Sequence, residues 1–243
     1  MNRPESLNSR DATPENSIAV FFQCFRNRKA VDYCLQEFRR FHPDAPIRLI
    51  SDAGDDFSDM ADKYGTIFIR ESTNCAPGAK LGGVSQTFEW LRRLSDACET
   101  FNAKWILLME EDVLTRSEIN RFPATDSAGV CTRPYHPKLD EYVRSRNMSQ
   151  QKLGVGLCGG SVFSRTAFLD CYAHVNQFEA QLPAMIKLEK YMGTSRDYIL
   201  NTLFYLNNRT YSEWDELTEN CPEYSQRPDA ALLHNFKNFY DPA

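Results

Sequence analysis

Four short apolar segments, separated by three stretches with helical periodicity, constrain the fold of this 243-residue chain more than any other feature. Each apolar segment is rich in leucine, β-branched or aromatic side chains, which indicates strands that are buried on both faces. We expect strands at residues 17–24, 47–50, 66–70 and 105–109, and helices at residues 28–41, 57–64 and 84–101. This alternation predicts an α/β fold whose open, mostly parallel central sheet is flanked by helices.

The second half of the chain has a less regular pattern and predicts a smaller, mixed part. Short strands are expected at residues 129–132 and 154–163, and helices at residues 180–192 and 196–206. The polar segment 137–152 is expected to be a loop, and a candidate lid over a ligand. The chain from Glu219 onward is expected to be irregular.

Charge and cysteine content exclude several classes of protein. The formal net charge of -5 argues against a general nucleic-acid binder, which would carry a basic face. Neither a signal peptide nor an apolar stretch of ~18 residues is found, so a cytoplasmic protein without a transmembrane segment is expected. None of the eight cysteines forms a C-x-x-C pair, which leaves a zinc knuckle unsupported and predicts free thiols in a reducing compartment.

Three carboxylates follow the fourth apolar strand directly: Glu110, Glu111 and Asp112. Three adjacent negative charges repel one another unless a cation or solvent compensates them. In open α/β sheets the ligand crevice lies at the carboxyl ends of the strands, where these residues fall. Side chains alternate along an extended chain, so Glu110 and Asp112 are expected on one side, in a pattern that suits Mn²⁺ or Mg²⁺. A solvated strand end is the simpler alternative.

Four apolar strands that alternate with helices and end in E-E-D resemble the GT-A fold of nucleotide-sugar glycosyltransferases. The D-x-D motif of that family occupies this place, and here the first Asp is replaced by Glu110. The resemblance implies that Asp112 binds the metal directly, that Glu111 reaches the ribose, and that Glu110 acts through the metal or water. It covers residues 18–234 as a series of short motifs.

Three further motifs of the family pattern have candidates in the same order along the chain. The glycine-bearing segment 154–161 would line the sugar site with Gly159 and Gly160, although a tight bend in a strand would also explain it. Asp197 resembles the acid that deprotonates the acceptor in inverting members, and helix capping is the competing explanation. His234 occupies the position of the histidine that returns to the metal.

The resemblance also implies contacts to the nucleotide from the ends of the first two strands. Gln23 and Arg26 end the first strand, and Asp52 ends the second, where it resembles the acid that many members use near the base. A turn residue before a glycine is the alternative for Asp52. Lys80, in the loop before the long helix, is a candidate for the diphosphate, and a solvated loop lysine is the alternative.

Together these motifs predict one glycosyltransferase domain over residues 17–243, preceded by a polar tail at residues 1–16. Residues 17–114 would form its nucleotide-binding half and residues 115–243 its acceptor-binding half. The expected reaction is metal-dependent sugar transfer from a UDP- or GDP-linked donor to a glycan or glycoprotein hydroxyl, with inversion. A catalytically silent nucleotide- or sugar-binding module is the alternative. Nucleotidyltransferases and dehydrogenases are disfavoured, because no glycine-rich motif follows Cys24.

Overall fold

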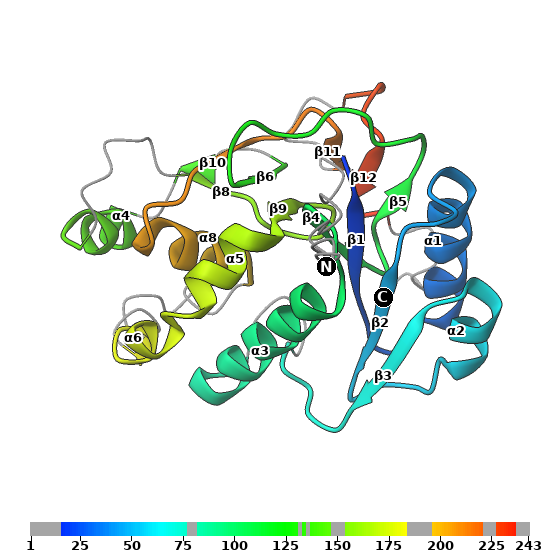
Figure 1. The fold of residues 1–243 in the computed structure, drawn as a ribbon, viewed down its shortest axis with the longest axis horizontal. Coiled ribbons are helices and arrows are strands. Elements are labelled where there is room, and N and C mark those ends of the chain that lie inside the picture. Colours follow the sequence, from blue (N-terminus) through cyan, green and yellow to red (C-terminus); the bar gives the residue numbers. More distant parts are fainter. Residues whose placement is uncertain are drawn as a thin grey trace, which may run out of the picture.

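The computed structural model of the protein describes residues 16–76, 82–130, 133–134, 137–146, 154–183, 196–220 and 227–236. Its first half alternates strands and helices as the sequence predicts (Figure 1). The strands are β1 (Ile18–Cys24), β2 (Ile47–Asp52), β3 (Ile67–Glu71) and β4 (Trp105–Glu110), and the helices are α1 (Arg28–Phe41), α2 (Ser58–Tyr64) and α3 (Val84–Thr100). The predicted bounds of these elements are confirmed to within two residues.

Local sequence signals explain where the first two helices begin and end. The side chain of Asn27 accepts a hydrogen bond from the backbone N–H of Ala30 (3.2 Å) and so caps the start of α1. Pro43, just beyond α1, cannot continue the helical hydrogen bonding. Helix α2 ends at Gly65, whose φ of 59° lies in the left-handed region that glycine adopts without steric cost.

The central sheet has seven strands in the order β10-β6-β9-β4-β1-β2-β3. Strand β1 lies between β2 and β4 and runs parallel to both, and β2 pairs in parallel with β3. Because these four strands are parallel, their carboxyl ends meet at one edge of the sheet. Strand β9 (Val162–Ser164) runs antiparallel to β4 and to β6 (Ser127–Gly129). The predicted fold class, a mostly parallel sheet flanked by helices, is therefore confirmed.

Successive side chains of the central strands enter two hydrophobic cores on opposite faces of the sheet. Phe21 and Leu108 belong to the core that includes α3, whereas Phe22 and Leu107 belong to the core that includes α1. Figure 1 shows α1 and α2 on one side of the sheet and α3 and α5 (Arg165–Tyr172) on the other. A strand covered on both faces has to be apolar throughout, which accounts for the WILLM sequence of β4.

The remaining elements form the mixed part of the molecule. They are β5 (Leu114–Thr115), β7 (Arg133–Pro134), α4 (Pro137–Arg144), β8 (Gly154–Val155), α6 (Val175–Glu179), α8 (Arg196–Leu206), β10 (Tyr211–Glu213), β11 (Leu217–Glu219) and β12 (Leu232–His234). The helix predicted at residues 196–206 is confirmed by α8. The helix predicted at residues 180–192 lies largely outside the described residues.

Four predictions for this half were wrong. Residues 137–144 form helix α4 rather than a loop, because a proline suits its first position, Val143 is buried, and Arg144 pairs with Asp140 one turn earlier (2.7 Å). The strand expected at residues 129–132 is β6, which ends at Gly129. The strand expected at residues 154–163 is interrupted between β8 and β9, where Gly160 has a φ of 83°. The tail from Glu219 contains β12 rather than irregular structure alone.

A second, three-stranded sheet brings the end of the described chain back to β4. Its order is β11-β12-β5, with β12 parallel to β11 and antiparallel to β5. Strand β5 follows the carboxylate turn by one residue, and its Leu114 pairs with Leu233. This pairing places His234, the next residue, beside that turn.

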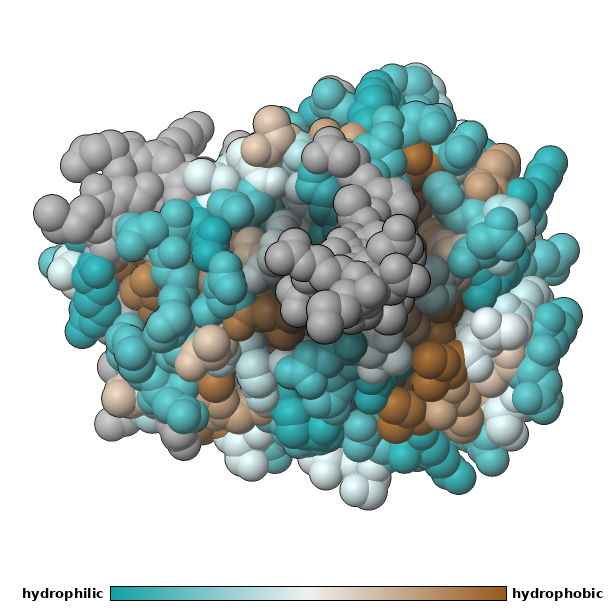
Figure 2. Space-filling view, in the orientation of Figure 1, coloured by the Kyte–Doolittle hydropathy of each residue, from teal (hydrophilic) through white to brown (hydrophobic). Residues whose placement is uncertain are grey.

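The face of the molecule in Figure 2 is mostly hydrophilic, with smaller hydrophobic areas between the polar residues. Among the described residues, Ile67 at the edge strand β3 is the large hydrophobic side chain that is most exposed, at 47%. No helix within the described ranges has both the length and the apolar composition that crossing a membrane requires.

Candidate functional site

The three consecutive carboxylates point in different directions at the end of β4. Glu110, the last residue of the strand, accepts a hydrogen bond from Arg196 Nη2 at its Oε2 (2.9 Å). Glu111 instead turns toward the end of β1, where its Oε2 accepts a hydrogen bond from the backbone N–H of Phe25 (3.3 Å). Glu110 and Glu111 are thus each held by a partner from a different part of the chain.

Asp112 lies beside His234. The Asp112 Oδ1 and His234 Nε2 atoms are 3.9 Å apart, and both side chains are largely buried. The backbone fixes this approach, because the N–H of Phe236 donates to the carbonyl of Asp112 (2.9 Å). Two residues 122 positions apart in the sequence therefore meet at the carboxyl end of the sheet.

Gly159 and Gly160 pass close to the same carboxylates. A Cβ at Gly159 would lie 3.2 Å from His234 Cδ2 and 3.3 Å from the carboxyl carbon of Glu110, so any side chain there would crowd both residues. Gly160 donates its N–H to the carbonyl of Leu108 in β4 (2.7 Å), and a Cβ there would lie 2.6 Å from Leu217 Cδ1. The glycine segment packs directly on the end of β4, and Gly159 borders the space between Glu110 and His234.

The start of α8 contributes one cation and one more carboxylate. Burial lowers the pKa of Arg196, but the charges of Glu110, Asp112 and Asp197 and the hydrogen bond to Glu110 outweigh that effect, so the pKa is raised and the guanidinium stays cationic. Asp197 Oδ1 accepts a hydrogen bond from the backbone N–H of Tyr198 (3.0 Å). Arg196 therefore provides a positive charge inside an otherwise acidic cluster.

Gln23 and Asp52 lie in a buried hydrogen-bond network beneath the strand ends. Gln23 Nε2 donates to Asp52 Oδ2 (3.0 Å), and Gln23 Oε1 accepts from Trp90 Nε1 (2.9 Å). Asp52 Oδ1 accepts from Arg93 Nη1 (2.7 Å) and from the backbone N–H of Cys75 (2.8 Å). Both side chains are at least nine-tenths buried and already form hydrogen bonds inside the protein.

Arg26 is the exposed member of the predicted nucleotide-contacting group. Its guanidinium carbon lies 4.6 Å from the centre of the Phe25 ring, at the end of β1. Since Phe25 also donates its backbone N–H to Glu111, Arg26 and Glu111 lie close together at this edge. Lys80 lies outside the described residues.

Asp112 and His234 fit the requirements of a bound Mn²⁺ or Mg²⁺ ion. Their facing atoms are 3.9 Å apart, a separation that two bonds of ~2.1 Å to one ion can span. In the part of the chain that the structure describes, no three His, Cys, Asp or Glu side chains converge as a metal-binding group. Substrate phosphates and water commonly complete the coordination shell of such an ion.

Sequence reasoning assigned no role to three residues that the structure places here: Arg196, Cys158 and Glu219. Cys158 Sγ lies 3.6 Å from His234 Nδ1. Burial and the charges of Asp197, Glu219 and Glu110 raise the pKa of Cys158 well above its usual value, so its thiol stays neutral. Arg196 could have been suspected from its position next to Asp197, whereas Glu219 has no local sequence signal.

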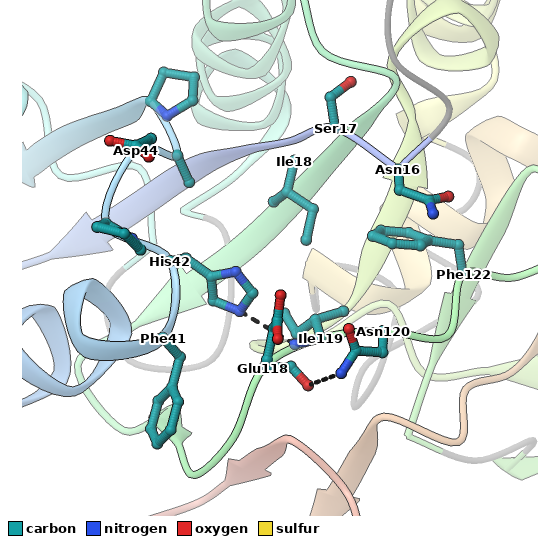
Figure 3. A pocket seen from close by; sticks show the side chains of 13 residues that line it. Asn16, Ser17, Ile18, Phe41, His42, Asp44, Glu118, Ile119, Asn120 and Phe122 are labelled. Carbon is teal, nitrogen blue, oxygen red and sulfur yellow. Dashed lines mark hydrogen bonds between the residues drawn. The ribbon is translucent and has the colours of Figure 1, made fainter.

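A cavity of about 490 Å³ lies at the opposite end of the strands (Figure 3). Ile18 at the start of β1 lines it, together with residues before β2 and in the segment 118–122. His42 borders the cavity, stacks on Phe38, and accepts a hydrogen bond from the backbone N–H of Ile119 at Nε2 (3.2 Å). The cavity is separate from the carboxylate cluster, which lies at the carboxyl ends of the same strands.

His42 should make stability depend on pH. Burial lowers its pKa below the usual value, more than the nearby charge of Glu118 raises it. The unfolded chain therefore binds a proton more readily, and stability should fall as pH drops through the unfolded pKa of about 6.5. In urea titrations at pH 7.5 and 5.5, His42→Phe should lower the free energy of unfolding by about 1 kcal/mol at pH 7.5, because it removes a hydrogen-bond acceptor. The free energy of unfolding of this variant should depend less on pH than that of the wild type. An unchanged pH dependence would contradict this role of His42.

The comparison with solved structures shows the class of fold: the chain has the GT-A-type fold of glycosyltransferases. The galactosyltransferase LgtC, solved with donor and acceptor sugar analogues, matches with a TM-score of 0.50 and 15% identity over 88% of this chain and 86% of its own. The glycosyltransferase GlyE of Streptococcus pneumoniae matches with a TM-score of 0.50 and 12% identity over 90% of this chain, which spans 54% of that protein. No family model and no curated protein matches the sequence.

Proposed function

We propose that the protein is a metal-dependent glycosyltransferase that moves a sugar from a nucleoside diphosphate donor to an acceptor hydroxyl. The observation that carries this proposal is the meeting of Asp112 and His234 at the carboxyl end of β4, in a fold of the GT-A type. These residues would hold Mn²⁺ or Mg²⁺, whose positive charge would stabilise the departing diphosphate. LgtC was solved with donor and acceptor sugar analogues, which supports the same substrate class here.

The nucleotide would bind along the ends of β1, β2 and β4. Glu111, which accepts a hydrogen bond from Phe25, would accept hydrogen bonds from the ribose, and the exposed Arg26 would contact the nucleotide. Gln23 and Asp52 would act indirectly, by holding the segment around Cys75 that follows β3. Lys80, farther along that segment, is proposed to meet the diphosphate. UDP and GDP are both candidates for the leaving group.

The transferred sugar would lie near Gly159 and Gly160, because a side chain at Gly159 would crowd Glu110 and His234. Asp197 is proposed as the base that takes the proton of the acceptor hydroxyl. The acceptor oxygen would then form its bond to the anomeric carbon while the bonding pair leaves with the nucleoside diphosphate, which inverts the configuration. Positive charge that develops on the sugar would be stabilised by the surrounding carboxylates. A glycan or glycoprotein would supply the acceptor hydroxyl.

A catalytically silent nucleotide- or sugar-binding module is the second candidate, because it would bind its ligand through the same strand-end residues. The presence of Glu110 and Asp112 favours the enzyme, since loss of the acids proposed to hold the metal would favour the silent module. Formation of a glycosylated product from donor and acceptor distinguishes the two functions.

Isothermal titration calorimetry with UDP and GDP, with and without Mn²⁺, tests the proposal. One nucleotide should bind the wild-type protein in a metal-dependent manner, and Asp112→Ala should weaken that binding at least ~100-fold, since even residues behind a metal ligand change metal affinity 10–100-fold. Asp44→Ala, at the exposed rim of the far cavity, is the matched control and should bind normally. Equal binding by wild type and Asp112→Ala would refute the metal site.

A further inference from the structure

The two ring nitrogens of His234 face different acidic groups. Nε2 lies 3.9 Å from Asp112 Oδ1, and Nδ1 lies 3.7 Å from Glu219 Oε1. Glu219 is only 8% exposed, and nothing in the proposed reaction has so far required it. A carboxylate buried behind the imidazole, on the side away from Asp112, needs a physical explanation, because burying a charge is costly.

Backbone pairing and one side-chain amide hold Glu219 in this place. Strands β11 and β12 are parallel, with Glu219 opposite His234 in the register. The N–H of Asn220 donates to the carbonyl of His234 (2.9 Å), which continues the pairing. Asn235 Nδ2 donates to Glu219 Oε1 (2.8 Å), and the φ of 60° at Asn235 bends the chain so that its side chain returns to the carboxylate. The carboxylate is therefore fixed relative to the imidazole.

The partner of Nδ1 decides what Nε2 can do. Neutral histidine carries a proton on one nitrogen and a lone pair on the other. Glu219 Oε1, 3.7 Å from Nδ1, is beyond hydrogen-bond distance, but a negative charge there favours the proton on Nδ1 electrostatically and leaves the Nε2 lone pair facing Asp112. The thiol of Cys158, 3.6 Å from the same Nδ1, would favour the opposite tautomer if it donated its proton there. The Cys158 thiol has an alternative acceptor in the carbonyl of Gly159 (3.6 Å). When the thiol donates there, the charge of Glu219 decides the tautomer.

We propose that Glu219 is a positioning residue, which fixes His234 as the Nδ1–H tautomer and so presents the Nε2 lone pair to a divalent cation beside Asp112. This inference rests on the proposed function for the identity of the cation. The arrangement itself rests on the register of β11 and β12 and on the contacts of Asn235 and His234. Carboxylates behind a metal-binding histidine typically change metal affinity 10–100-fold.

Binding of Mn²⁺ alone and of Mn²⁺ with UDP, followed by electron paramagnetic resonance at pH 8, tests the role of Glu219. In both titrations Glu219→Ala should weaken Mn²⁺ binding about 10–100-fold. Glu219→Gln should weaken it almost as much, because an amide carries no negative charge. Asn235→Gly, which keeps the left-handed backbone but removes the amide donor, should have an intermediate effect.

Two control variants separate a positioning role from a general loss of stability. Glu216→Gln removes a carboxylate just before β11 that is also buried but pairs with Arg121 (3.0 Å), away from His234. It should lower stability and leave Mn²⁺ affinity unchanged. Cys158→Ala should leave Mn²⁺ affinity within about twofold of wild type. A loss in Cys158→Ala equal to that in Glu219→Ala would overturn the assignment of Nδ1 to the carboxylate.

The tautomer of His234 can be measured without a bound metal and without an activity assay. In ¹⁵N-histidine NMR spectra of the metal-free full-length chain, His234 should carry its proton on Nδ1, and Glu219→Ala should shift the population toward Nε2–H. A wild-type spectrum with the proton on Nε2 would overturn the proposal even if the variant fails to fold. Normal Mn²⁺ affinity in Glu219→Ala, with loss in Asp112→Ala, would overturn it and leave the proposed function intact. Absence of Mn²⁺ binding in the wild type would instead refute the metal-dependent function.

Discussion

Replacing Arg93 with methionine should lower the free energy of unfolding by about 3–5 kcal/mol, the usual cost of leaving a buried charge without its partner. Arg93 is 1% exposed and donates to Asp52 Oδ1 (2.7 Å) and to the carbonyl of Thr73 (2.9 Å). Without the guanidinium, the carboxylate of Asp52 would stay buried beside polar but uncharged groups. Urea unfolding at pH 7.5 measures the effect.

The neighbouring residue Arg92 provides a matched control. Its side chain is 44% exposed and forms ion pairs with Glu89 and Asp96 on the surface of α3. Exposed pairs of this kind contribute about 0–1 kcal/mol, so Arg92→Met should have a small effect. The double variant Asp52→Asn with Arg93→Met should regain part of the loss, because it removes both charges. A double variant less stable than Arg93→Met alone would contradict the explanation that the unpaired, buried carboxylate of Asp52 causes the loss.

The first half of the fold could be predicted from the sequence because its signals are local. Strand β4 is apolar on both faces since helices cover both, and the cap at Asn27 and the glycine at Gly65 mark helix ends within a few residues. The position of Glu110, Glu111 and Asp112 at the edge of the sheet followed from the end of β4 alone. Elements defined by local periodicity and by turn residues can be found this way.

Local sequence patterns could not predict most contacts of the candidate site, because these contacts depend on pairing between distant segments. Only the resemblance to the GT-A family indicated that His234 and Asp112 lie together. His234 reaches Asp112 only through the pairing of β12 with β5, and each of those strands is too short to produce a clear pattern. The same holds for Glu219, whose place is set by its register with His234. Asp52 is a further example. Its carboxylate accepts a hydrogen bond from Arg93, 41 residues away, and no property of the turn around Asp52 indicates this partner.

The assignment of Asp197 as the base leads to the prediction with the largest expected effect on activity. Asp197→Asn should lower kcat for sugar transfer about 10²–10⁴-fold, the range that a general base contributes. The amide oxygen of Asn can still accept the hydrogen bond from the N–H of Tyr198, so the first turn of α8 should be kept. Donor affinity, measured by calorimetry, should remain within about threefold of wild type, because the base acts on the acceptor.

This variant separates a base from a helix cap, the two explanations that the sequence leaves open for Asp197. If the carboxylate only stabilised the dipole of α8 from its first turn, Asn would lower stability by about 0.3–1 kcal/mol and leave kcat unchanged. Asp59→Asn in the first turn of α2, where an exposed carboxylate pairs with Arg28, should leave kcat unchanged. Full activity in Asp197→Asn would assign the residue to the helix and leave the acceptor proton to another group. A large loss of kcat with normal stability and donor affinity requires a role for the negative charge in the transfer step itself.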